Sequence, residues 1–267
     1  MVNPSLYVNA CLQRIACGGL VLVLLLCTML AHASTLATYG SGDTAIDTCR
    51  ANLSRDNIRM FWRDAAGNVL GSVDTLRAWL AKRGETLACA TNGGIYGTDL
   101  RPIGLYVEGG SLLHPLNTRK GAYGNFYLQP NGVFMLLANE AVIVATDVLA
   151  ASFDTVTPAI QYATQSGPIL VSAGKINPLL TPGSTNRVVR NAVCVMSSTE
   201  IGLVRSKAPI NFYDLARVMR EGMGCRDALL LDGSVSRLYP YDADKLGAPV
   251  GPLIAVIAKS APVQKPK

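Results

Sequence analysis

Short apolar runs, most of them five or six residues long, dominate this chain and limit the folds that it can adopt. The clearest lie at residues 103–107, 125–129, 132–137, 141–145, 168–172, 191–196, 201–205, 227–231 and 253–258. Runs of this length, bounded by turn residues, are typical of β-strands. The links EGG, PNG and SSTE favour hairpins, and short links of this kind force neighbouring strands to pair antiparallel.

Two stretches, residues 74–84 and 211–224, have helical spacing instead. Their apolar stripes consist of Leu76, Trp79 and Leu80 in the first and of Phe212, Leu215, Ala216 and Met219 in the second. We expect Asp74 and Asn211 to be the N-caps and Gly84 to end the first helix. The second stripe is interpreted as core packing rather than a cofactor site.

These patterns predict an α+β fold in a single domain over residues 34–260, with a largely antiparallel or mixed, curved β-sheet and a few flanking helices. Strands and helices do not alternate regularly, and no G-x-G-x-x-G motif opens a helix. A dinucleotide-binding fold of the Rossmann type is therefore not expected. The last residues, 261–267, are expected to be disordered.

The first 33 residues have the layout of a secretory signal peptide. Arg14 is their only charge, a run of about 17 apolar residues follows it, and AHA precedes Ser34. We expect cleavage there and a location in the periplasm or outside the cell, without a membrane span. The alternative is an uncleaved anchor, because the run reaches the lower limit of length for crossing a bilayer.

Cysteine usage agrees with export. Four cysteines follow the predicted signal: Cys49, Cys89, Cys194 and Cys225. An even number in an exported chain suggests two disulfides, with three possible connectivities. The smaller loops favour Cys49–Cys89 and Cys194–Cys225, and the alternative is that some of the four are buried free thiols.

The chemical inventory excludes several classes of site. No C-x-x-C pair exists, and after residue 33 the chain has one histidine, His114. A zinc or redox centre, or a metal site with two histidine ligands, is therefore not expected, and no cofactor is predicted. The 24 basic and 18 acidic residues are scattered, without a basic run that interleaves aromatics. Nucleic acid is thus not indicated as a partner.

Three groups of polar residues border apolar runs and are candidates for a binding or catalytic site. They are Thr91, Asn92, Gly93 and Gly94; Gln165, Ser166 and Gly167; and Asp232, Gly233 and Ser234. A carboxylate at the end of an apolar strand is partly desolvated yet accessible, which suits catalysis. Adjacent glycines let backbone approach a ligand. The alternative for the segment at Asp232 is an ordinary turn.

Arginine side chains suit the binding of anions, and two of them, Arg187 and Arg190, flank a pair of valines. Strand alternation would place them on opposite faces, so at most one is expected in a site. A Ser-His-Asp triad would have to use His114, and the sequence contains no G-x-S-x-G motif to supply its serine. That histidine is interpreted as a loop residue.

The ordered set TNGGIY, PIGLYVEGGSLLHPLN, GNFYLQPNGVF, QSGPILV, RNAVCV and CRDALLLDGSVSRLY resembles the phosphodiester glycosidase family over roughly residues 85–258. The uncovering-enzyme-like domain and its bacterial exported branch, which is associated with exopolysaccharide metabolism, are the nearest in pattern. The resemblance implies cleavage of a sugar–phosphate diester at the anomeric carbon. The sequence departs from the family at Ser234 and Val235, which stand where glycines are common.

The resemblance also implies roles for individual residues. Asn92, Gly93 and Gly94 would line the site, Arg190 would contact an anion, and Asp232 with Gly233 would form its centre. A second carboxylate is not identified; Asp99, Glu108 and Asp227 are candidates. Arg237 would add an anion contact or be solvated. The alternative function is a non-catalytic glycan-binding or exopolysaccharide-assembly protein that retains the cleft.

Overall fold

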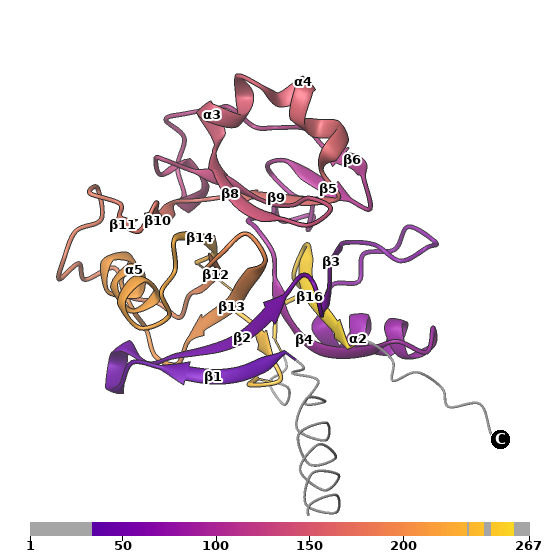
Figure 1. Ribbon diagram of the computed structural model, residues 1–267, viewed down its shortest axis with the longest axis horizontal. Coiled ribbons are helices and arrows are strands. Elements are labelled where there is room, and N and C mark those ends of the chain that lie inside the picture. The colour runs from indigo at the N-terminus through magenta and orange to yellow at the C-terminus, as the bar shows by residue number, and fades with distance from the viewer. Residues whose placement is uncertain (1–33, 234, 243–246, 259–267) are drawn as a thin grey trace, which may run out of the picture. The chain divides into compact units, whose positions relative to one another are not determined.

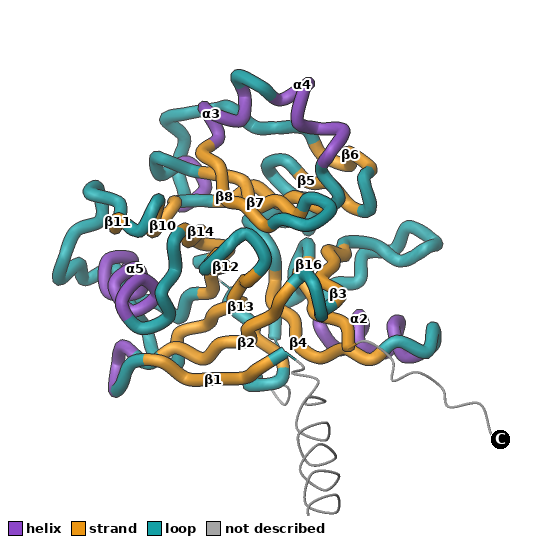
Figure 2. The backbone as a smooth tube through the Cα atoms, in the orientation of Figure 1, coloured by secondary structure: helices purple, strands orange, loops and turns teal. Residues whose placement is uncertain are grey.

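The computed structural model describes residues 34–233, 235–242 and 247–258 (Figures 1 and 2). The predicted signal at 1–33, Ser234 and the predicted tail at 261–267 lie outside the described residues. Within these ranges all strand pairs are antiparallel, and few helices accompany them. The α+β class and the antiparallel pairing are therefore confirmed, and the strands divide among three sheets.

The largest sheet has seven strands. In spatial order they are β1 (Thr35–Tyr39), β2 (Ile46–Asn52), β13 (Glu200–Ser206), β12 (Asn191–Val195), β14 (Asp227–Asp232), β10 (Ile169–Ser172) and β11 (Lys175–Ile176). One face packs on α5 (Phe212–Glu221) in a cluster that includes Leu215, Ala216 and Met219. This confirms that the predicted stripe is core packing, with Phe212 packed at its edge.

The other face of this sheet meets the two smaller sheets in a shared apolar core. The four-stranded sheet has the order β15 (Leu238–Tyr239), β4 (Thr86–Asn92), β16 (Leu253–Ala258) and β3 (Asn57–Phe61). The five-stranded sheet has the order β6 (Ser111–His114), β5 (Tyr106–Glu108), β9 (Tyr162–Ser166), β7 (Gly132–Leu136) and β8 (Ala141–Ala145). The ends of strands from different sheets therefore come together around one core.

Short helices cover the outer faces of the two smaller sheets. They are α2 (Val73–Ala81), α3 (Thr146–Ala150) and α4 (Phe153–Val156). The 3₁₀ turns are η2 (Gly42–Thr44), which links β1 and β2 of the large sheet, η3 (Asn125–Tyr127) and η4 (Thr157–Ala159). Leu76 and Leu80 of α2 are fully buried against the four-stranded sheet. On α5, Asn211 is the N-cap as predicted, since its side chain accepts from the Asp214 N–H. The predicted N-cap of α2 is wrong: Ser72 accepts from the Thr75 N–H, and Asp74 lies in the first turn.

The strand predicted at 125–129 is wrong. The chain there forms η3, because the N–H groups of Tyr127 and Leu128 bond to carbonyls three residues earlier. Phe126 is the buried residue of this turn, and the Asn131 side chain binds its carbonyl at 2.9 Å. PNG is consequently no hairpin link, whereas EGG and SSTE do join paired strands.

Both expected disulfides are present. Cys49–Cys89 ties β2 of the seven-stranded sheet to β4 of the four-stranded sheet. Cys194–Cys225 ties β12 to the residues just before β14. The alternative of buried free thiols is thereby excluded for these four residues.

Candidate active site

The ends of three strands, β4, β12 and β14, meet through side-chain amides. Asn191 donates its amide N–H groups to Thr91 Oγ1 (2.8 Å) and to Asn92 O and Oδ1 (2.8 and 3.0 Å). The Asp232 N–H donates back to Asn191 Oδ1 at 2.9 Å. Asn92 Nδ2 donates to Asp232 Oδ2 at 3.2 Å across 140 residues of chain. Asn92 and Asp232 are thus brought together.

The same asparagine fixes the segment that follows Asp232. Asn92 Nδ2 donates to Val235 O at 2.7 Å, and Asn92 Oδ1 accepts from the Arg237 N–H at 2.9 Å. Thr91 Oγ1 donates to Arg237 O at 2.6 Å. Every hydrogen-bonding group of the Asn92 side chain is therefore used to shape the loop around the carboxylate.

Tyr96 is the second side chain that bonds to Asp232. Burial, the charge of Asp232 and the hydrogen bond to it raise the pKa of Tyr96 well above its ordinary value. The tyrosine stays protonated and donates to the carboxylate, because a phenolate beside a carboxylate would be strongly disfavoured. A β-carbon on Gly251 would lie 2.7 Å from Tyr96 Cγ, so this glycine leaves room for the ring.

Arg190 is a buried cation held by neutral groups. Its side chain donates from Nε to Ile210 O (2.8 Å) and from Nη2 to Asn186 O and Oδ1 (2.9 and 3.1 Å). The guanidinium also stacks on the Phe212 ring at 3.8 Å, and the residue is 1% exposed. Burial lowers the pKa of Arg190 to about 10, which leaves it charged at neutral pH.

None of the ion pairs found within the described ranges includes Arg190. A buried charge is costly without a counter-charge. This arrangement favours an anion from outside the chain.

Two nitrogen donors converge on Gly233, the residue after Asp232. A β-carbon here would overlap Asn125 Nδ2 and would lie 3.3 Å from Arg190 Nη1. Only glycine therefore lets the Asn125 amide and the guanidinium approach this backbone together. A cleft of about 490 Å³ opens here, lined by Val188, Val189, Arg205, Gly233, Val235, Ser236, Arg237 and Ala248.

Comparison with known proteins gives the family of this chain. The family model described as phosphodiester glycosidase matches residues 85–256. The chain belongs to the phosphodiester glycosidase family. It is also 31% identical over 218 residues, 82% of this chain and 83% of its relative, to the uncharacterised protein YigE of Escherichia coli strain K12.

Solved structures similar to this phosphodiester glycosidase-family chain share its fold at low identity. One is the catalytic domain of zebrafish N-acetylglucosamine-1-phosphodiester alpha-N-acetylglucosaminidase, auto-inhibited by its pro-peptide. It has a TM-score of 0.55 at 13% identity, covering 85% of this chain and 83% of that one. A putative exported protein from Burkholderia pseudomallei K96243 has a TM-score of 0.52 at 14% identity, over 79% and 73% of the two chains.

The glycines of the first polar group shape the end of β4 in this family member. The Gly93 N–H donates to Pro252 O at 2.7 Å, so it is already used inside the protein. Gly94 has a φ of 79°, and a β-carbon on it would overlap Thr164 Oγ1. These residues thus permit close packing of β4 on β9.

The second polar group also makes internal bonds. Gln165 Oε1 accepts from the N–H groups of Leu105 (2.8 Å) and Asn117 (3.0 Å), and its Nε2 donates to Asn117 O and Thr146 Oγ1. Ser166 Oγ donates to Leu231 O at 2.9 Å, one residue before Asp232. A β-carbon on Gly167 would lie 2.7 Å from Asn131 Cβ. This group therefore stabilises the segments next to Asp232.

The remaining sequence candidates lie elsewhere in the family fold. Arg187 is exposed and pairs with Asp214 at 3.6 Å, so Arg190 is the arginine of the pair that reaches the site. Asp227 stands at the opposite end of β14 from Asp232. Asp99 is exposed beside Arg101, and Glu108 accepts from the Trp62 N–H. His114 ends β6, with Nδ1 3.3 Å from Pro115 O.

The sequence patterns did not predict Asn125, Asn191 or Tyr96 as site residues. Asn191 is a polar residue at the start of a wholly buried strand, and that position was a usable signal. Asn125 could not be predicted as a site residue, because its segment was expected to be a strand. Within the described ranges, no three His, Cys, Asp or Glu side chains gather as a metal site would need. Among the same residues, no helix has the length and apolar character to cross a membrane.

Proposed function

We propose that the protein is an exported hydrolase that cleaves a glycosyl-1-phosphodiester in envelope or extracellular polysaccharide metabolism. Water adds at the anomeric carbon, the bond from that carbon to the phosphate oxygen breaks, and a free sugar and a phosphomonoester result. The observation that carries the proposal is Arg190, a buried cation without a carboxylate partner in the described chain, whose Nη1 lies beside Gly233.

The phosphate of the substrate binds at Gly233. Arg190 Nη1 and Asn125 Nδ2 converge there and supply charge-assisted and neutral hydrogen bonds to its oxygens. As the bond breaks, negative charge gathers on the departing phosphomonoester, and preorganised donors stabilise it in the transition state. A phosphomonoester leaves well without full protonation, so a strong general acid is not required.

Asp232 acts on the sugar side. The residue is 6% exposed, and its carboxylate is oriented by Asn92 and Tyr96. It stabilises the positive charge that develops on the ring, as nucleophile, base or electrostatic partner. The phosphate donors converge on Gly233, the residue directly after Asp232, so the carboxylate and the donors can act on the two sides of one scissile bond.

Export and a glycan substrate are supported by separate features. Family membership favours a glycan phosphodiester as the substrate, and the relative titled as a putative exported protein shares the fold. The two disulfides suit an oxidising compartment, periplasmic or extracellular.

One observation favours a second candidate, a glycan-binding or exopolysaccharide-assembly protein without turnover. The Asp232 side chain is nearly enclosed, and Ser234 and Val235 replace the glycines expected after it. In that case the site would bind a phosphodiester through Arg190 and Asn125 but would lack access for water.

The test is turnover of an aryl phosphodiester of a sugar 1-phosphate in ¹⁸O-labelled water. A phosphodiester glycosidase releases free sugar and an unlabelled aryl phosphate, whereas an ordinary phosphodiesterase releases the phenol and a labelled sugar phosphate. We expect the first pair of products. Asp232→Asn and Arg190→Lys should each lower the rate at least about a hundredfold.

The matched control is Asp147→Asn, at an exposed carboxylate that pairs with Lys120. It should leave the rate unchanged. Saturable binding of the diester without any product would instead establish the binding protein, and label in the phosphate would exclude glycosidase chemistry.

A further inference from the structure

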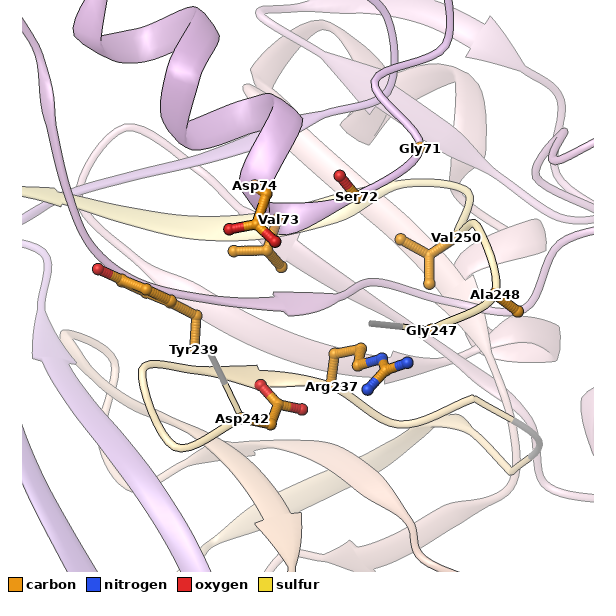
Figure 3. Close-up of a pocket in the computed structure, with 10 residues that line it drawn as sticks. All are labelled: Gly71, Ser72, Val73, Asp74, Arg237, Tyr239, Asp242, Gly247, Ala248 and Val250. Carbon is orange, nitrogen blue, oxygen red and sulfur yellow. The ribbon is translucent and has the colours of Figure 1, made fainter. Parts of the chain in front are cut away.

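From the sequence, Arg237 is a candidate for an added anion contact, and the proposed reaction does not use its side chain. Its backbone is fixed by Asn92 and Thr91. Its side chain lines a second cavity of about 300 Å³ (Figure 3). The cavity is lined by Gly71, Ser72, Val73, Asp74, Arg237, Tyr239, Asp242, Gly247, Ala248 and Val250.

Of the three charged residues that line this cavity, two form ion pairs and one does not, among the described residues. Asp74 pairs with Arg77 at 3.0 Å, and Asp242 pairs with Arg205 at 3.7 Å. Among the residues that the structure describes, Arg237 takes part in no ion pair. Because Asp74 and Asp242 each have an arginine partner, Arg237 is the charged lining residue without an ion-pair partner among the described residues.

The other walls suit a sugar ring. Tyr239 contributes an aromatic side chain to the lining, and Val73 and Val250 are apolar. The residues Ser72–Asp74 begin α2, whose first-turn N–H groups add a weakly positive potential. Arg237 lies against Gly247, where a β-carbon would overlap its guanidinium, so the small residue leaves space for the charge inside the cavity.

This cavity adjoins the cleft at Gly233, since Arg237 and Ala248 line both. We propose that it is a second subsite, which binds an anionic saccharide unit beyond the scissile phosphate, with Arg237 contacting its carboxylate or phosphate. The inference rests on the proposed function, since it assigns both cavities to one substrate. It makes the substrate an acidic glycan.

The test is binding, measured without turnover. Backbone amide resonances of Ser72, Val73 and Asp74 are followed by NMR while D-glucuronate, D-glucose 6-phosphate or neutral D-glucose is added. We expect these three amides to shift with one or both anionic sugars and at least about tenfold less with glucose. The stronger of the two anionic ligands identifies the source of the charge.

Variants locate the response. Arg237→Gln keeps the backbone bonds to Asn92 and Thr91, and it should abolish the shifts of Ser72–Asp74. Arg220→Gln, at an exposed arginine on α5, should leave them unchanged. Equal shifts with glucose, shifts retained in Arg237→Gln, or none with either anionic sugar would overturn the inference. If the protein hydrolyses the aryl diester but these amides do not respond as expected, only the second subsite is refuted. If the amides respond but no diester is hydrolysed, only the proposed hydrolase activity is refuted.

Discussion

At the scale of single residues, the candidate site depends on primary amides. Asn92 and Asn191 each donate and accept at once, so two side chains satisfy the ends of three buried strands. A hydroxyl or a carboxylate could not fill both roles in the same geometry. Asn125 adds a donor at Gly233.

Replacing Asn191 with alanine should therefore destabilise the protein. The change removes the side-chain acceptor of the Asp232 N–H and one donor each to the Asn92 carbonyl and the Asn92 side-chain oxygen, all in a buried network, which costs about 2–4 kcal/mol of unfolding free energy. Urea denaturation measures this loss. Asn68→Ala, at an exposed asparagine, should change stability by no more than about 0.5 kcal/mol. Equal effects of the two variants would show that the amide network contributes little.

Gly233→Ala should separate activity from stability. The added methyl displaces the Asn125 amide, so turnover of the aryl diester should fall at least about tenfold while the urea midpoint changes little. In an Asn125→Ala background the same substitution should cost clearly less, because the overlap is gone. Additive losses in this double-mutant cycle would mean that Asn125 does not act at Gly233.

The sequence allowed a partial prediction at this scale. Asn92, Arg190 and Asp232 could be proposed because each borders an apolar run or matches a family motif. Asn125 could not, since the reach of its amide depends on a 3₁₀ turn that local apolar pattern does not distinguish from a strand. The use of the Gly93 N–H by Pro252 depends on the pairing of β4 with β16, two strands far apart in the chain, which no local pattern contains.

At the scale of elements, one partly buried carboxylate joins two sheets. Glu108 of β5 accepts from the Trp62 N–H, just after β3, at 3.0 Å, and from the Tyr106 hydroxyl at 2.9 Å. Burial raises the pKa of Glu108 above its ordinary value, and the two hydrogen bonds only partly offset that effect. The folded protein thus binds this proton more tightly than the unfolded chain does.

The raised pKa of Glu108 determines how the unfolding free energy changes with pH. Stability from the protonated Glu108 is present below its unfolded pKa and is lost as pH rises through the higher folded pKa. Glu108→Gln has no such proton, so its unfolding free energy relative to wild type should increase between about pH 4 and pH 7. Urea titrations of both proteins across this range measure the difference. A difference that stays flat or falls would contradict the assignment.

Elements with strong local signals were predictable, and those shaped by tertiary contacts were not. The stripe and cap of α5 and the apolar runs at β7, β8 and β12 were identified from spacing alone. Strands such as β2 and β9 carry polar residues at buried positions, where they bond to neighbouring segments. That pattern lacks the apolar alternation by which a strand is identified.

At the scale of the whole molecule, the two disulfides close loops of similar length but differ in position. Their sequence separations are 40 and 31 residues. Cys49–Cys89 links two sheets three residues before Asn92, whereas Cys194–Cys225 lies within the seven-stranded sheet and its approach to β14. Only the first directly restrains β4 against another sheet.

Removal of either disulfide by paired cysteine-to-alanine changes should cost about 4 kcal/mol of unfolding free energy, from loop entropy. Activity should distinguish the pairs. The Cys49→Ala/Cys89→Ala protein should lose turnover under conditions where both variants remain folded, because β4 carries Asn92. Retained turnover in that variant, with loss in the other, would contradict this account of how the sheets position the site.

The antiparallel α+β architecture and both disulfides followed from short links and from loop length. The division into three sheets did not, because which strands pair depends on contacts between segments as far apart as β2 and β13. The convergence of β4 and β14 was expected only through the family resemblance. Their shared bond between Asn92 and Asp232 gives that expectation a physical basis.

The central claim is that Arg190 and Asn125 bind a phosphate at Gly233 while Asp232 faces the sugar. A crystal structure of the protein with glucose 1-phosphate tests it most directly. We predict phosphate oxygens within hydrogen-bonding distance of Arg190 Nη1 and Asn125 Nδ2, with the anomeric carbon next to the Asp232 carboxylate. A phosphate bound elsewhere, or a sugar turned away from Asp232, would contradict the claim.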